Sequence, residues 1–245
     1  MTADAPTILA TSGGMIPGRR IRWELGPLTE HALDLAGVQS RAPKVCFMAT
    51  ACGDDAARVR EFYDAAQSRG LCASHLALFT MPNVEDIAAH LLAQDVIWVG
   101  GGSVAGLLAM WELHGVGDAL RAAWRYGVVL TGVSAGSICW HTGGPTDSFG
   151  PDLRPVTNGL GLVPFSNGVH YDSEQQRRPA FHSLIADGTL PAGFATDDGV
   201  GLLYRGTQLA EALTEQDGKA AYYVERGAGE RGGQTVETRI EPRRL

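Results

Sequence analysis

The stretch VLTGVSAGSICW, residues 129–140, connects two apolar runs through Gly132-Val133-Ser134-Ala135-Gly136. The residues before this pentapeptide have the apolar character of a buried strand, and those after Ser134 are compatible with a helix. A serine between two glycines at such a turn fits the Gly-x-Ser-x-Gly nucleophile elbow, in which the glycines allow a sharp turn that exposes the hydroxyl. An ordinary turn rich in glycine and serine has the same composition, so the interpretation depends on the rest of the chain.

Working outward, the first half of the chain alternates short apolar runs with amphipathic stretches. The predicted strands are 6–11, 44–50, 74–79, 95–100 and 127–133, and the predicted helices are 25–36, 55–69, 84–93, 104–114 and 117–125. This alternation predicts an α/β fold with a mostly parallel sheet that helices cover on both faces. Ligands of such sheets bind beyond the carboxyl ends of the strands. Three glycine-containing segments besides the elbow follow predicted strands, at 12–14, 50–54 and 100–103.

The second half of the chain does not continue this regular alternation of strands and helices. Residues 143–158 are rich in Gly, Pro and Asp and predict a loop or irregular hairpin, followed by a strand at 160–169 and a helix near 173–186. Short, mostly antiparallel strands are predicted at 194–198, 200–205, 208–213 and 220–225, and the polar segment 226–245 has a weak strand pattern at 235–241. Because no repeat or linker divides the chain, we expect a single domain over residues 1–245.

Composition excludes several classes of protein. The chain has 245 residues, of which 44% are hydrophobic, and a net charge of -7, which argues against nucleic acid as a partner. It contains neither a basic leader followed by an apolar segment nor a run of about 18 apolar residues, so we expect no membrane partner and a cytoplasmic location. The four cysteines show no CxxC spacing, which favours a reducing compartment.

A serine nucleophile requires a base and an acid that orients it. His170 ends the predicted strand 160–169 and can face Ser134 across the edge of the sheet, although it also suits a turn histidine bonded to Asp172. No histidine follows His182, which argues against an esterase of the α/β-hydrolase type. Spacing alone leaves the acid open among Asp147, Asp152, Asp172, Asp197 and Asp198.

An oxyanion site requires backbone N–H groups. Ala135 at the predicted helix start offers one, and the glycines at 100–102 after the neighbouring strand offer another. The same glycines lack the lysine of a phosphate-binding loop, and the histidines show no metal-binding register. We therefore expect no cofactor and no metal.

Three segments together resemble the peptidase E (aspartyl dipeptidase) and cyanophycinase family of serine peptidases. They are GGGS at 100–103, GVSAGS at 132–137 and VHYDSE at 169–174, within a resemblance that extends from the first strand to about residue 213. The resemblance implies a flavodoxin-like three-layer sandwich related to class I glutamine amidotransferases, with extra antiparallel strands toward the C-terminus. In those amidotransferases the elbow carries cysteine, where this chain has Ser134.

The resemblance also implies roles for individual residues. Ser134 becomes the nucleophile and His170 the base, while the N–H groups of Gly102 and Ala135 form the oxyanion hole. The family's acid lies in the segment after the elbow helix, which selects Asp147.

The resemblance implies substrate binding for Arg177, Arg178 and Gly101. For the two arginines the reason is that a guanidinium matches the carboxylate of a P1 aspartate in bidentate fashion. The chain departs from the family at two points. Ser103 stands where asparagine is usual, and the segment between His170 and the arginines is shorter than in aspartyl dipeptidases.

The expected function is a serine peptidase that hydrolyses short peptides, with Asp-X dipeptides as the substrates that the resemblance implies. We expect a monomer or a homodimer. The alternatives are a catalytically inactive, amidotransferase-like binding domain and a hydrolase of the cyanophycinase or esterase type.

Overall fold

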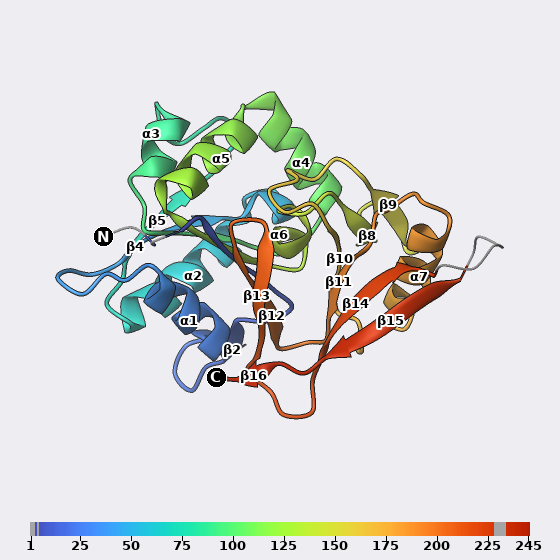
Figure 1. Ribbon diagram of the computed structural model, residues 1–245. Coiled ribbons are helices and arrows are strands. Elements are labelled where there is room, and N and C mark those ends of the chain that lie inside the picture. Colours follow the sequence, from blue (N-terminus) through green and yellow to red (C-terminus); the bar gives the residue numbers. More distant parts are fainter. Residues whose placement is uncertain (1–2, 4, 228–233) are drawn as a thin grey trace.

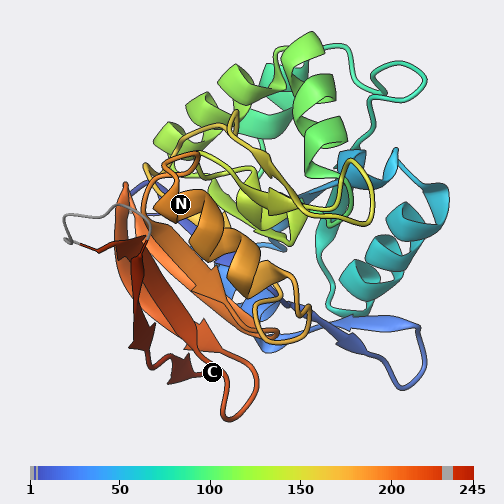
Figure 2. The same ribbon diagram turned by 90° about the vertical axis from the view of Figure 1, so that its right-hand side faces the viewer.

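The computed structural model of the protein describes residues 3, 5–227 and 234–245, and its main body has three layers (Figure 1). A central eight-stranded sheet lies between two groups of helices, as the sequence predicted. A smaller four-stranded sheet is attached on one side, and one long helix covers it (Figure 2). The α/β fold class is thereby confirmed, with antiparallel strands concentrated toward the C-terminus.

The central sheet has the strand order β16-β13-β12-β1-β7-β6-β4-β5. Five neighbouring strands are parallel: β1 (Thr7–Thr11), β7 (Val129–Val133), β6 (Val96–Val99), β4 (Lys44–Met48) and β5 (Cys72–Leu76). The antiparallel strands β12 (Val200–Arg205) and β13 (Gln208–Thr214) extend the sheet beyond β1, and β16 (Arg243–Arg244) ends it. The parallel strands bring their carboxyl ends to one edge, where the site lies.

Helices cover both faces of this sheet because its strands are apolar on both sides. On β6, Val96 and Trp98 pack with one helical group, and Ile97 and Val99 pack with the other. The first group comprises α1 (Pro27–Leu35) and α2 (Ala56–Ser68), and the second comprises α3 (Ile87–Leu92), α4 (Val104–Leu113), α5 (Val116–Tyr126) and α6 (Ala135–Ile138). The two groups lie on opposite sides of the sheet in Figure 1.

The smaller sheet has the order β10-β11-β14-β15. Its strands are β10 (Ser166–Gly168), β11 (Gly193–Thr196), β14 (Ala221–Arg226) and β15 (Thr235–Ile240), and α7 (Arg177–Ala186) packs against it. Two hairpins complete the fold, β2 (Met15–Pro17) with β3 (Trp23–Leu25), and β8 (Gly144–Thr146) with β9 (Arg154–Val156). A 3-10 turn, η1 (Thr50–Cys52), follows β4.

Two local predictions need correction. The predicted strand 160–169 is reduced to β10, because the N–H groups of Leu162 and Val163 bond to Trp140 O and turn this segment back onto the end of the elbow helix. The hairpin β2–β3 was not predicted at all. The predicted strand at 235–241 is present as β15, whereas residues 228–233 of the polar segment 226–245 lie outside the described residues. Among the described helices, none is long and apolar enough to cross a membrane.

Candidate active site

The elbow turns at Ser134, between the end of β7 and the start of α6. Ser134 has φ 59° and ψ -112°, a positive-φ conformation that a residue with a side chain rarely adopts and that costs about 1–3 kcal/mol. The surrounding structure maintains it, since the Ser134 N–H donates to Thr11 O at 3.1 Å. A serine held in this way at a strand–helix turn matches the elbow predicted from the sequence.

The glycines on either side of Ser134 are required by close backbone contacts. A Cβ on Gly136 would lie 2.2 Å from Val99 O, and one on Gly132 would lie 2.4 Å from Gly136 O. Both distances are far below van der Waals contact. The pattern Gly-x-Ser-x-Gly therefore reflects the packing of the turn against β6 as well as its conformation.

The loop after β6 approaches the serine from the other side. A Cβ on Gly101 would lie 3.3 Å from Ser134 Cβ and 3.9 Å from its Oγ. Gly102 has φ 138°, and a side chain there would meet Ala51 O at 2.3 Å. Among the residues that the structure describes, the N–H groups of Gly102 and Ala135 have no hydrogen-bond acceptor. Both groups are therefore available to a ligand beside Ser134.

His170 follows β10 of the smaller sheet and is tied to the end of β1. Its N–H donates to Ser12 Oγ at 3.3 Å, and Ser12 Oγ lies 2.7 Å from Thr196 Oγ1. Because Thr11 binds the backbone of Ser134 and Ser12 binds that of His170, two consecutive residues anchor both segments. Within the described part of the chain, no hydrogen bond joins the Ser134 hydroxyl to His170. Such contacts are often long in unliganded enzymes and tighten when substrate binds.

Asp198 is the carboxylate that contacts His170. Its Oδ1 lies 2.6 Å from His170 Nδ1, and this hydrogen bond is the main cause that lowers the pKa of Asp198. The N–H of Asp198 in turn donates to Asp172 Oδ1 at 2.9 Å, and Asp172 pairs with Lys219. His170 is only 21% exposed and Asp198 36% exposed, so this hydrogen bond is partly shielded from water.

The other candidate acids occupy different positions. Asp147, which the family resemblance selected, is 61% exposed and lies 3.8 Å from Arg177, so the place beside His170 Nδ1 belongs to Asp198 instead. Asp152 is exposed in the β8–β9 loop. Asp197 points the other way, accepting from the N–H of Ala220 and the hydroxyl of Tyr222, and burial raises its pKa.

Arg177 is buried and binds partners within the protein. Its guanidinium donates to Glu174 at 2.6 Å and to Pro145 O at 2.8 Å, with Asp147 nearby. This arginine fixes the hairpin β8–β9 to the start of α7. The side chain is only 4% exposed, and its contacts identify a structural role in place of the substrate contact that the resemblance implied.

Arg178 is also paired internally. It binds Glu237 of β15, and its guanidinium lies over the rings of Tyr171 and Tyr222 at 5.2 and 4.9 Å. Glu237 additionally accepts from Tyr171 at 2.9 Å and contacts His182 at 2.9 Å. Glu237 of β15 thus holds Arg178, at the start of α7, against the smaller sheet.

A further histidine lies close to the elbow in sequence. His141 is buried between Ser137 O at 2.9 Å and the hydroxyl of Tyr204 at 3.0 Å, and burial lowers its pKa to about 4. Both ring nitrogens are occupied, so this histidine is structural. His170 is therefore the histidine at the sheet edge whose Nε2 has no hydrogen-bond partner among the described residues.

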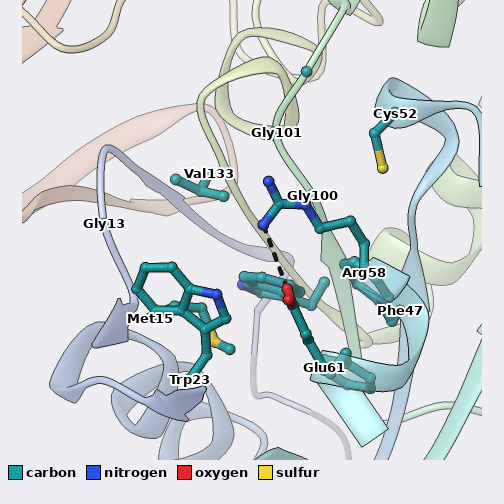
Figure 3. Close-up of a pocket in the computed structure, with 13 residues that line it drawn as sticks. Gly13, Met15, Trp23, Phe47, Cys52, Arg58, Glu61, Gly100, Gly101 and Val133 are labelled. Atoms are coloured by element: carbon teal, nitrogen blue, oxygen red, sulfur yellow. Dashed lines mark hydrogen bonds and ion pairs between the residues drawn. The ribbon is translucent and has the colours of Figure 1, made fainter. Parts of the chain in front are cut away.

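A pocket opens beside the elbow on the side of α2 (Figure 3). Its volume is about 430 Å³, and Gly101, Gly102 and Val133 form the wall nearest to Ser134. The remaining lining residues come from the hairpin β2–β3, from β4 and β6, from α2, from the turn η1 and from the loops after β1 and β6: Gly13, Met15, Trp23, Phe47, Cys52, Arg58, Glu61, Phe62, Trp98 and Gly100. Among these, the sequence analysis had singled out the glycines and the segment 50–54 that contains Cys52, but none of the aromatic or charged residues.

Comparison with known proteins identifies the family. The model of peptidase family S51 matches residues 8–212. The chain belongs to peptidase family S51. Uncharacterized peptidase YgaJ of Bacillus subtilis (strain 168) is 42% identical over 182 residues, which cover 74% of this chain and 78% of that protein. Membership of S51 supports peptidase activity and therefore a hydrolase, as the sequence analysis expected.

Two solved structures share the fold of this S51 chain. A candidate peptidase E from Listeria monocytogenes EGD-e has a TM-score of 0.57 at 16% identity, with 96% of this chain and 98% of that chain covered. A peptidase from an acI-B1 actinobacterium has a TM-score of 0.64 at 16% identity, with 96% and 97% covered. At this identity the two matches support the architecture alone, which agrees with the predicted resemblance to peptidase E.

Proposed function

We propose that this S51 protein is a serine-type peptidase that hydrolyses short peptides, with Ser134 as the nucleophile, His170 as the base and Asp198 as the acid that orients it. The observation that carries the proposal is the 2.6 Å contact between His170 Nδ1 and Asp198, on a histidine anchored next to the strained elbow. With Nδ1 engaged by the carboxylate, Nε2 is the nitrogen that can accept the serine proton.

The chemistry follows from these positions. Ser134 Oγ attacks the scissile carbonyl while His170 Nε2 takes its proton, and the resulting oxyanion accepts hydrogen bonds from the N–H groups of Gly102 and Ala135. The imidazolium then gives its proton to the departing amine, and an ester on Ser134 remains. Water attacks this ester with His170 again as the base, which releases the carboxylic acid and restores the serine. Asp198 stabilises the imidazolium in both halves of the cycle.

The proposal does not require aspartate at P1. The two arginines implied as its ligands, Arg177 and Arg178, bind Glu174 and Glu237 within the protein. We therefore propose short peptides as the substrate class, and we assign the selection of side chains to the pocket beside the elbow.

A digestion experiment tests the proposed function. A library of dipeptides to pentapeptides is incubated with the protein, and new fragments are identified by mass spectrometry. We expect hydrolysis that persists in EDTA and stops after treatment with phenylmethanesulfonyl fluoride, because the nucleophile is a serine hydroxyl. The proposal fails if the library stays intact, or if the sulfonyl fluoride leaves hydrolysis unchanged while EDTA abolishes it.

A further inference from the structure

The pocket on the α2 side of the elbow is placed to receive part of the substrate. Gly101 belongs both to the pocket wall and to the loop that faces the serine, since a Cβ on it would lie 3.3 Å from Ser134 Cβ. Val133, directly before the nucleophile, is another wall residue. A group held in this pocket is therefore next to the reacting carbonyl. Its volume of about 430 Å³ falls in the range of small-ligand sites, about 300–1,000 Å³.

The floor of the pocket is a rigid set of aromatic rings. Phe47 stacks on Phe62 with centroids 4.8 Å apart and on Trp98 at 5.0 Å, and Phe62 and Trp98 are 5.8 Å apart. The three rings come from β4, α2 and β6 and are almost completely buried. Met15 and Trp23 of the hairpin β2–β3 add an apolar wall (Figure 3). Such a surface favours an apolar side chain through burial and ring contacts.

The charged residues at the pocket are paired with one another. Glu61 is 15% exposed and receives two guanidiniums, from Arg22 at 2.9 Å and from Arg58 at 3.4 Å. In Figure 3 the Glu61 carboxylate lies inside the ring of lining residues and pairs with Arg58. An aspartate side chain entering here would have to compete with the Glu61 carboxylate for both guanidiniums, whereas an apolar side chain would leave this ion-pair cluster intact.

We propose that the pocket accepts a large apolar side chain, aromatic or long aliphatic, from a residue that flanks the scissile bond. This inference rests on the proposed function for its link to catalysis. It assigns the enzyme a preference for phenylalanine or leucine over alanine and aspartate. Burial of such a side chain is expected to raise kcat/KM by about 10–100-fold over alanine.

The first test measures hydrolysis of matched short peptides that carry Phe, Leu, Ala or Asp on either side of the scissile bond. We expect a preference of about 10–100-fold for Phe or Leu over Ala and Asp at one of the two positions. The position that shows it tells which side of the bond the pocket serves. Equal rates at both positions, or a preference for Asp, would overturn the inference.

The second test is independent of turnover. Cys52 lines the pocket and is half-buried, whereas Cys72 is exposed on β5 away from it, so the two thiols form a matched pair. In the Ser134→Ala variant, a phenylalanine-containing tripeptide should slow the reaction of Cys52 with N-ethylmaleimide and leave Cys72 unaffected. The aspartate analogue should protect neither thiol.

The two tests separate failure of the inference from failure of the proposed function. Selective protection of Cys52 without any peptide hydrolysis would refute the peptidase and retain the apolar pocket. Hydrolysis without protection of Cys52, or equal protection by both tripeptides, would refute the pocket assignment and retain the peptidase.

Discussion

Replacing Ser134 with alanine is expected to lower kcat for peptide hydrolysis by about 10⁶-fold, the scale on which a Ser-His-Asp triad loses activity without its nucleophile. His170→Ala should cost about as much. The double variant should be no worse than either single one, because the serine and its base act as a unit. The variants should still accelerate hydrolysis by about 10³–10⁴-fold over the uncatalysed reaction in water, since the N–H groups of Gly102 and Ala135 remain.

The control for this prediction is the stability of the variant. Alanine keeps the Cβ and the backbone at position 134, so we expect the thermal midpoint to move by no more than about 2–4 °C, which corresponds to about 1 kcal/mol in a chain of this size. Ser68→Ala, at the end of α2, supplies a matched substitution far from the site and should leave kcat unchanged. If the loss of kcat in the double variant equalled the product of the two single losses, Ser134 and His170 would act independently, which would contradict the proposed joint role.

Asp198→Asn is expected to reduce kcat by about 10⁴-fold, because an amide in this place favours the wrong tautomer of His170 and no longer stabilises the imidazolium. The change preserves the shape of the side chain. Asp198 is ionised with its pKa lowered by the hydrogen bond to His170, so the wild-type protein keeps this contact down to acidic pH. Steady-state kinetics on one cleaved peptide measure the effect.

Asp147→Asn is the control that distinguishes the two candidate acids. Asp147 is 61% exposed and its nearest cation is Arg177 at 3.8 Å, so this variant should keep kcat within a few-fold of the wild type. A large loss in Asp147→Asn together with a small one in Asp198→Asn would reverse the assignment and restore the acid that the family resemblance selected.

Most of the fold could be predicted because the parallel strands are apolar on both faces and alternate with amphipathic helices. Strands such as β6, with Val96 and Trp98 on one face and Ile97 and Val99 on the other, carry a signal within a few residues. The hairpin β2–β3 could not be found this way, because its strands have three residues each and include Pro17. When strands are this short, their pairing depends on the tertiary structure around them and leaves no periodic pattern in the sequence.

The candidate site was predictable where a residue follows a strand of the central sheet. Ser134 and the loop at 100–103 lie at the shared carboxyl edge, so topology alone brings them together. Asp198 was one of five open candidates, because its contact with His170 depends on how the smaller sheet meets the larger one. Arg177 could not be distinguished from a ligand, since its burial against Pro145 and Glu174 is a tertiary property.

Labelling with a fluorophosphonate, followed by mass spectrometry of the digested protein, tests the central claim most directly. The account predicts one adduct per chain, located on Ser134, that forms on the folded protein and forms much more slowly in His170→Ala, because the base activates the hydroxyl. An adduct on a different serine would contradict the assignment of the nucleophile to Ser134. A folded protein that remains unlabelled would contradict it as well and would favour a binding domain that has lost its chemistry.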